Sequence, residues 1–150
     1  MRKRLDVIAT QPEAYKAMSA LEGYVRNSSL SPVHRELIKI RASQINGCAY
    51  CINMHTLDAR KAGETEQRIY LLDAWRETDL FSEEEKAILA LTEEVTLIHN
   101  HVSDTTYDRA AELFDDAYLA QIIMTIVTIN AWNRLAITGK KPLPTTSQDR

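Results

Sequence analysis

Two cysteines, a histidine and a glutamate have spacings that could support thiol chemistry. Cys48 and Cys51 form a C-x-x-C motif, and His55 follows four residues after the second cysteine. On an α-helix these three positions fall within an arc of about 60°, so their side chains share one face. Residues three apart on a helix have Cα atoms about 5 Å apart, within the range that a disulfide tolerates. The pair can therefore close and open without unwinding the helix.

The predicted position of the cysteines favours an ionised thiol. Gly47 is expected to end one helix, which places both sulfurs in the first turn of the next. Unpaired N–H groups and the positive end of the helix dipole stabilise a thiolate there and lower the pKa of the thiol. Because the thiolate is the nucleophile, the reactive fraction at neutral pH rises.

A base and a group that orients it are also within reach. His55 lies one turn after Cys51 but two turns, on the order of 10 Å, after Cys48, so it serves Cys51 better. Glu36 falls within an apolar stripe of the preceding helix, where a carboxylate is costly unless it is paired. We therefore expect Glu36 to orient and charge His55, which completes a nucleophile–base–orienter set.

Less specific interpretations exist for the same residues. A lone C-x-x-C motif is also half of a zinc site, but zinc needs a second ligand pair. The other histidines, His34, His99 and His101, fit no standard spacing from this motif. His55 could also be a histidine satisfied in the core, and Glu36 a partly exposed ion-pair partner. The combination of all four residues with the helix break favours redox chemistry, with no bound metal.

The elements that must position these residues are helices. Capping residues and apolar spacing predict an all-α, single-domain bundle of about six to seven helices over residues 1–139, with a C-terminal tail over 140–150. The last helix is apolar nearly all round, which suggests a subunit interface. The predicted helix starts are Thr10, Ser31, the region of Cys48, Thr65, Ser82, Ser103 and Asp115.

Composition restricts the class of protein. The chain has 150 residues, of which 45% are hydrophobic and 26% charged, as expected for one globular domain. Its formal net charge of −3 removes the electrostatic case for a nucleic-acid partner. No apolar run is long enough for a signal peptide or a membrane span. We therefore expect a soluble, cytoplasmic protein, in which a C-x-x-C motif indicates redox chemistry rather than a structural staple.

The four residues also carry a family resemblance. The pattern resembles the signature of the AhpD-like alkylhydroperoxidases of the carboxymuconolactone decarboxylase family. That signature is a glutamate, eleven residues, C-x-x-C, three residues and then a histidine. It is matched in residue type and spacing by Glu36, Cys48, Cys51 and His55. Softer similarity covers about residues 21–137. The resemblance implies an AhpD-like all-helical fold, assembly into trimers or hexamers, and peroxide reduction by the cysteine pair.

The resemblance further implies individual roles. Cys51 would form the sulfenic acid, while Cys48 would supply a proton and then resolve the intermediate. Tyr50 stands where the best-known alkylhydroperoxidase has a histidine; tyrosine can donate a hydrogen bond but is a poor base at neutral pH, and it could equally pack beside the site. Asn130, on the apolar last helix, is expected either to line the pocket or to pair across an interface.

The predicted function is a thiol-dependent peroxidase of antioxidant defence that reduces hydrogen peroxide or small organic hydroperoxides. It would hold no bound cofactor and would need an external dithiol of the lipoyl or thioredoxin type. One alternative is a thiol–disulfide oxidoreductase partner of a peroxiredoxin, with little peroxidase activity of its own. Another is the lactone decarboxylation for which the wider family is named, which generally does not use a cysteine pair. A non-catalytic oligomeric scaffold is the fourth possibility.

Overall fold

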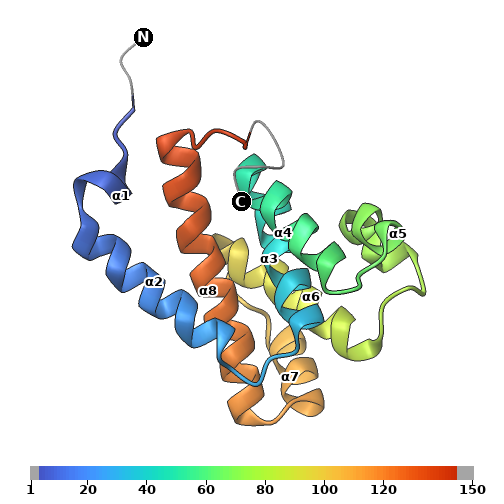
Figure 1. Cartoon of the computed structure of the whole chain (residues 1–150). Coiled ribbons are helices and arrows are strands. Elements are labelled where there is room, and N and C mark those ends of the chain that lie inside the picture. The colour runs from blue at the N-terminus through green and yellow to red at the C-terminus, as the bar shows by residue number, and fades with distance from the viewer. Residues whose placement is uncertain (1–3, 145–150) are drawn as a thin grey trace.

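The computed structural model describes residues 4–144, and all the regular structure in this part of the chain is helical (Figure 1). The predicted all-α class is therefore confirmed. The α-helices are α1 (Val7–Thr10), α2 (Pro12–Arg26), α3 (Pro32–Asn46), α4 (Ala49–Lys61), α5 (Glu66–Tyr70), α6 (Glu83–Thr96), α7 (Asp104–Leu113) and α8 (Asp116–Gly139). Two 3₁₀ helices, η1 (Leu72–Glu77) and η2 (Ile98–Asn100), connect them.

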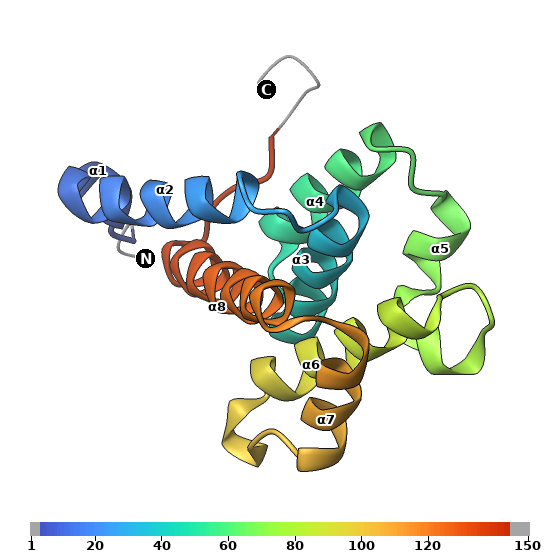
Figure 2. The same cartoon turned by 90° about the horizontal axis from the view of Figure 1, so that it is seen from below.

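Helices α3 and α8 form the centre of the molecule. Helix α3 packs against α4, α6 and α8, and α8 also packs against α2, α6 and α7. Figure 2 shows α8 between α2 on one side and α6 with α7 on the other. The core between these helices is aliphatic and includes Ile38, Ile88, Ile122 and Ile126, all fully buried. This core fixes α3 against α4, the two helices that carry the predicted thiol chemistry.

Most of the predicted helix starts are confirmed by their caps. The side chains of Ser31, Thr65, Ser103 and Asp115 each accept a hydrogen bond from a backbone N–H in the first turn of the helix that follows. Ser82 forms a capping box with Glu85, in which each side chain accepts from the other residue's backbone N–H. These bonds satisfy donors that a helix start leaves unpaired.

Two predictions about the helices were wrong in detail. Thr10 does not start α2; it ends the short helix α1, and its hydroxyl donates to the carbonyl oxygen of Asp6 at 2.7 Å. Gln11 precedes α2 without a side-chain cap. The helix expected from Thr65 is also interrupted after α5, and η1 follows with Ala74 outside helical geometry. In η1, the indole of Trp75 donates to Glu93 of α6 at 2.8 Å, a tertiary bond that local spacing does not reveal.

Gly47 turns the chain sharply between α3 and α4. Its φ of 69° and ψ of 33° lie in the left-handed region, which side chains other than glycine disfavour. The turn is closed by two backbone bonds, from Gly47 N–H to Gln44 and from Cys48 N–H to Ser43. Cys48 consequently becomes the residue that caps α4.

Replacing Gly47 with alanine should lower the free energy of unfolding by about 1 kcal/mol, because a Cβ is strained at a positive φ although nothing lies within 4 Å of it. Gly23→Ala is the matched control: Gly23 lies inside α2, also with open space around it, and alanine there should be neutral or stabilising. Urea unfolding of both variants checks this. Equal destabilisation by the two substitutions would show that the turn is not strained.

Candidate thiol site

The two cysteines are bonded to each other at the start of α4. Cys48 caps the helix, and its Sγ accepts the backbone N–H of Cys51 at 3.4 Å. The disulfide joins Cα atoms that are 5.3 Å apart, as expected for positions three apart on a helix. Both residues are buried. The first turn of α4 can therefore hold the oxidised pair, with both sulfurs at the positive end of the helix dipole.

His55 and Glu36 form a buried pair across α3 and α4. Nδ1 of His55 lies 2.8 Å from Oε2 of Glu36, and both side chains are about nine-tenths buried. The second carboxylate oxygen of Glu36 lies 3.6 Å from Nε of Arg35. Because Glu36 engages Nδ1, the other ring nitrogen of His55 is left to act as the base.

Burial by itself would raise the pKa of Glu36. The hydrogen bond from His55 and the nearby charges of His55, Lys39 and Arg35 oppose that effect, and together they hold the pKa of this carboxyl below its ordinary value. Glu36 is therefore a carboxylate at neutral pH. A carboxylate bonded to one nitrogen of an imidazole fixes the ring's orientation and can stabilise the charge that forms when the ring takes a proton.

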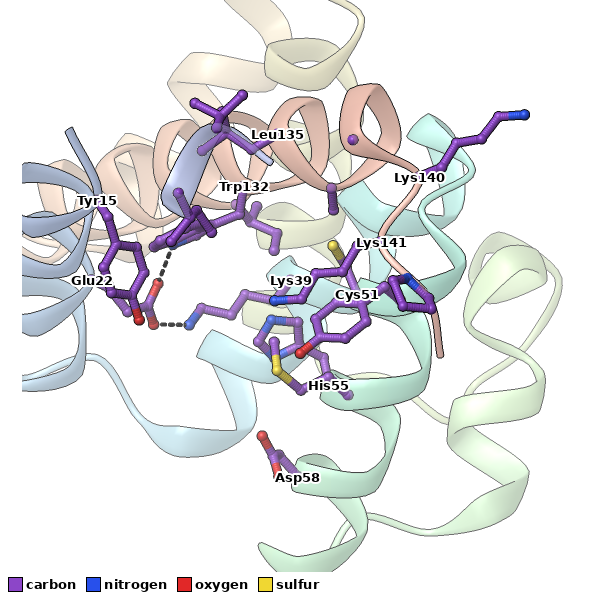
Figure 3. A pocket seen from close by; sticks show the side chains of 18 of the residues that line it. Tyr15, Glu22, Lys39, Cys51, His55, Asp58, Trp132, Leu135, Lys140 and Lys141 are labelled. Atoms are coloured by element: carbon purple, nitrogen blue, oxygen red, sulfur yellow. Dashed lines mark hydrogen bonds and ion pairs between the residues drawn. The ribbon is translucent and has the colours of Figure 1, made fainter. Parts of the chain in front are cut away.

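A cavity of about 1400 Å³ opens onto this group. Glu36, Cys51 and His55 line it, together with residues from α1, α2 and α8 and from the segment after α8. Figure 3 shows the side chains of Cys51 and His55 pointing into the same space. Cys48 is not among the described residues that line it. A small molecule that enters the cavity therefore meets Cys51 first.

The two residues predicted as possible pocket residues lie in different places. Tyr50 does line the cavity, and Nζ of Lys141 lies 4.1 Å from the centre of its ring. Asn130 is not among the described lining residues. Its amide accepts a hydrogen bond from Asn46 at 2.9 Å and donates to Thr96 at 3.1 Å, between α3, α6 and α8. Asn130 thus links α8 to α3 and α6 through its side-chain bonds.

Sequence comparison identifies the family. Residues 12–94, more than half of the chain, match the Carboxymuconolactone decarboxylase family. The chain belongs to the carboxymuconolactone decarboxylase family. The chain is also similar to the uncharacterised protein YdfG of Bacillus subtilis, with 50% identity over 138 residues, which cover 91% of this chain and 94% of YdfG.

Solved structures of similar proteins support the same fold. Atu0492 from Agrobacterium tumefaciens, a protein of unknown function for which an AhpD antioxidant role has been suggested, superposes with a TM-score of 0.92 and 38% identity over 97% of this chain and all of that one. The debrominase Bmp8 superposes with a TM-score of 0.83 at 17% identity, over 92% of this chain and 75% of Bmp8. The AhpD-like fold predicted from the sequence is confirmed.

Three residues that line the cavity were not predicted from the sequence. Lys39 and Trp132 line it with Glu22, and Glu22 bonds to both of them. The signal that could have identified Lys39 is its position three residues after Glu36 on α3, in a run that is buried from Glu36 to Ile40. A lysine inside such a run is unusual, because a buried ammonium needs a partner.

Within residues 4–144, no group of three or more His, Cys, Asp or Glu residues could hold a metal ion. Over the same stretch, no helix is long and apolar enough to cross a membrane.

Proposed function

We propose that this protein is a thiol-dependent peroxidase that reduces hydrogen peroxide or small organic hydroperoxides. The observation that carries the proposal is the Glu36–His55 pair, 2.8 Å across, which lines one cavity with Cys51 while Cys51 is bonded to Cys48. The Glu36–His55 pair can take the proton of the Cys51 thiol and so generate a thiolate. Cys48 can then resolve the sulfenic acid that forms when this thiolate is oxidised. Family membership supports the same assignment, because AhpD-like proteins share this fold.

In the reduced protein, His55 takes the proton of the Cys51 thiol directly or through a water. The Cys51 thiolate attacks the distal oxygen of the hydroperoxide, and the O–O bond breaks. The distal oxygen stays on sulfur as a sulfenic acid, and the leaving alkoxide takes a proton and departs as an alcohol, or as water from hydrogen peroxide. The Cys48 thiol then displaces hydroxide from the sulfenic sulfur, which releases water and forms the disulfide.

The cycle needs a reductant. We propose an external dithiol of the lipoyl or thioredoxin type, which attacks the disulfide and leaves as a disulfide itself. The protein would then require no bound cofactor. A homo-oligomer, a trimer or hexamer by family resemblance, and a cytoplasmic location complete the proposal. Partial exposure of apolar residues on α8, including Val127 and Ile137, supports a subunit interface on that helix.

A steady-state assay tests the proposed activity. The protein is mixed with hydrogen peroxide or cumene hydroperoxide and with dithiothreitol, dihydrolipoamide or reduced thioredoxin, and peroxide loss is followed. We expect consumption well above that of the free dithiol, with at least one of the three reductants. If the protein does not speed up peroxide loss with any combination of peroxide and dithiol, the peroxidase assignment is wrong.

A thiol–disulfide oxidoreductase is the second candidate. It is favoured by Tyr50, which occupies the position before Cys51 and is a poor base for a proton relay. Such a protein would exchange its disulfide with a partner such as a peroxiredoxin. Rapid reduction of the disulfide by a dithiol without peroxide consumption would favour this function. Lactone decarboxylation generally does not use a cysteine pair, so retention of that activity in a Cys51→Ser variant would favour it instead.

A further inference from the structure

A buried lysine extends across the cavity from α3 toward α2. The side chain of Lys39 is 4% exposed, and its Nζ forms an ion pair with Oε1 of Glu22. The other carboxylate oxygen of Glu22 accepts the indole N–H of Trp132 at 3.1 Å (Figure 3). Burying an ion pair costs desolvation free energy that apolar side chains of similar size would avoid. The presence of this pair in the cavity of Cys51 indicates a role beyond packing.

The position of Lys39 relates its charge to the thiol site. Lys39 follows Glu36 by three residues on α3, so the two are neighbours on one helix face, and both line the cavity. Burial raises the pKa of Glu36, and the hydrogen bond and charge of His55 lower it; the positive charge of Lys39 lowers it further. Without the charge of Lys39, the ionised form of Glu36 should be less favoured, and Glu36 should stabilise the protonated form of His55 less well.

We propose that Lys39 is a positioning residue of the thiol site, whose positive charge favours the ionised forms of Glu36 and Cys51, and that Glu22 of α2 attenuates this charge. The inference rests on the proposed thiol chemistry of Cys51. Lys39 forms no bond to the reacting atoms; it acts through the local potential and through Glu36 and His55. A charge inside a cavity of low dielectric acts over longer distances than the same charge in water.

Several other titratable groups face the cavity, and solvent screens the charged ones more strongly than it screens Lys39. Arg35 is the nearest, 3.6 Å from Glu36, and Tyr15 and Tyr50 contribute hydroxyl groups. Among the cavity-lining cations that the structure describes, Lys39 is the buried one. Because solvent and salt screen exposed charges, Lys39 should have the largest effect per charge. The remaining charged lining residues are Arg4, Asp6, Arg26, Asp58, Lys140 and Lys141.

The test measures the ionisation of Cys51 without peroxide. In a Cys48→Ser background, which leaves one thiol, the rate of alkylation by iodoacetamide is measured from pH 5 to pH 10. Lys39→Met should move the midpoint of the pH–rate profile upward and lower the rate at pH 7 by about threefold or more, because thiolate loses a favourable charge. Lys39→Arg should restore the profile of the parent protein.

Glu22→Gln should have the opposite effect, because it leaves Lys39 unneutralised while its amide oxygen can still accept from Trp132. We expect its profile to move to lower pH and its rate below the midpoint to rise. Loss of packing alone would move both variants in the same direction, so opposite shifts distinguish an electrostatic role from a structural one. If Lys39→Met does not fold, the direction of the Glu22→Gln shift still decides.

Arg41→Met is the matched control. Arg41 is also on α3 and largely buried, but it pairs with Glu93 of α6 and does not line the cavity. Its loss should lower stability, read as the midpoint of thermal unfolding, and leave the alkylation profile unchanged. The proposal is overturned if Lys39→Met and Glu22→Gln shift the profile in the same direction, or if neither shifts it. Because alkylation needs no peroxide, failure of the peroxidase assay would be a separate result.

Discussion

Cys51→Ser should abolish peroxide consumption, with a loss of about a hundredfold or more, whereas Cys48→Ser should still react once with peroxide. The asymmetry follows from the site: Cys51 lines the cavity with His55, and Cys48 lies behind it as the cap of α4. Without Cys51 no thiol meets the substrate. Without Cys48 the sulfenic acid on Cys51 forms but finds no second thiol to resolve it.

Intact mass spectrometry with a sulfenic acid trap checks this assignment. After one equivalent of peroxide, the reduced wild-type protein should lose the mass of two hydrogens as the disulfide closes. Cys48→Ser should yield a dimedone adduct on Cys51, and Cys51→Ser should yield none. An adduct on Cys48 in the Cys51→Ser variant would show that the first cysteine attacks, as it does in thioredoxin-type motifs, and would reverse the two roles.

Glu36→Gln should lower the reactivity of Cys51 at pH 7 by about tenfold, because the charge that favours the His55 imidazolium formed when Cys51 ionises is lost. The amide of glutamine can still bond to Nδ1 of His55, but it has no charge to stabilise the protonated ring. Alkylation by iodoacetamide in the Cys48→Ser background, compared at equal pH, measures the effect. An unchanged rate would show that His55 does not depend on Glu36.

Glu85→Gln is a suitable control for this substitution. Glu36 and Glu85 are both 8% exposed. Each carboxylate bonds to one side chain of another helix: Glu36 to His55 of α4, and Glu85 of α6 to Arg68 of α5. Neutralising Glu85 should reduce stability without affecting Cys51, because Glu85 does not line the cavity. Equal losses of thiol reactivity in the two variants would indicate a general destabilisation.

The same carboxyl predicts a dependence of stability on pH. The pKa of Glu36 is lowered in the folded protein by His55, against the opposing effect of burial, so its ionised form contributes stability above the unfolded pKa, about 4.3. That contribution is lost as the pH falls through the folded pKa. In urea unfolding at several pH values, wild-type stability should fall more steeply in this acid range than that of Glu36→Gln. Parallel curves would contradict the assigned pKa direction.

Much of the helical framework and the core of the thiol site could be predicted from local patterns. Capping residues such as Ser31 and Ser82, and the glycine at position 47, act on neighbouring atoms of the chain, so their effects are visible in short stretches of sequence. The spacing of Cys48 and Cys51 has the same property, because one helical turn determines their separation. The break after α5 was missed because it depends on Trp75 reaching another helix.

Side-chain contacts between helices required the packed structure. A carboxylate in an apolar stripe indicated that Glu36 needs a partner, but only the packing of α3 against α4 places it 2.8 Å from His55. The same packing bonds Asn130 to Asn46 and pairs Lys39 with Glu22, neither of which the spacing indicated. Helical periodicity specifies the face on which a residue lies. It does not specify which helix covers that face or at what angle, because those depend on the shapes of side chains distant in the sequence.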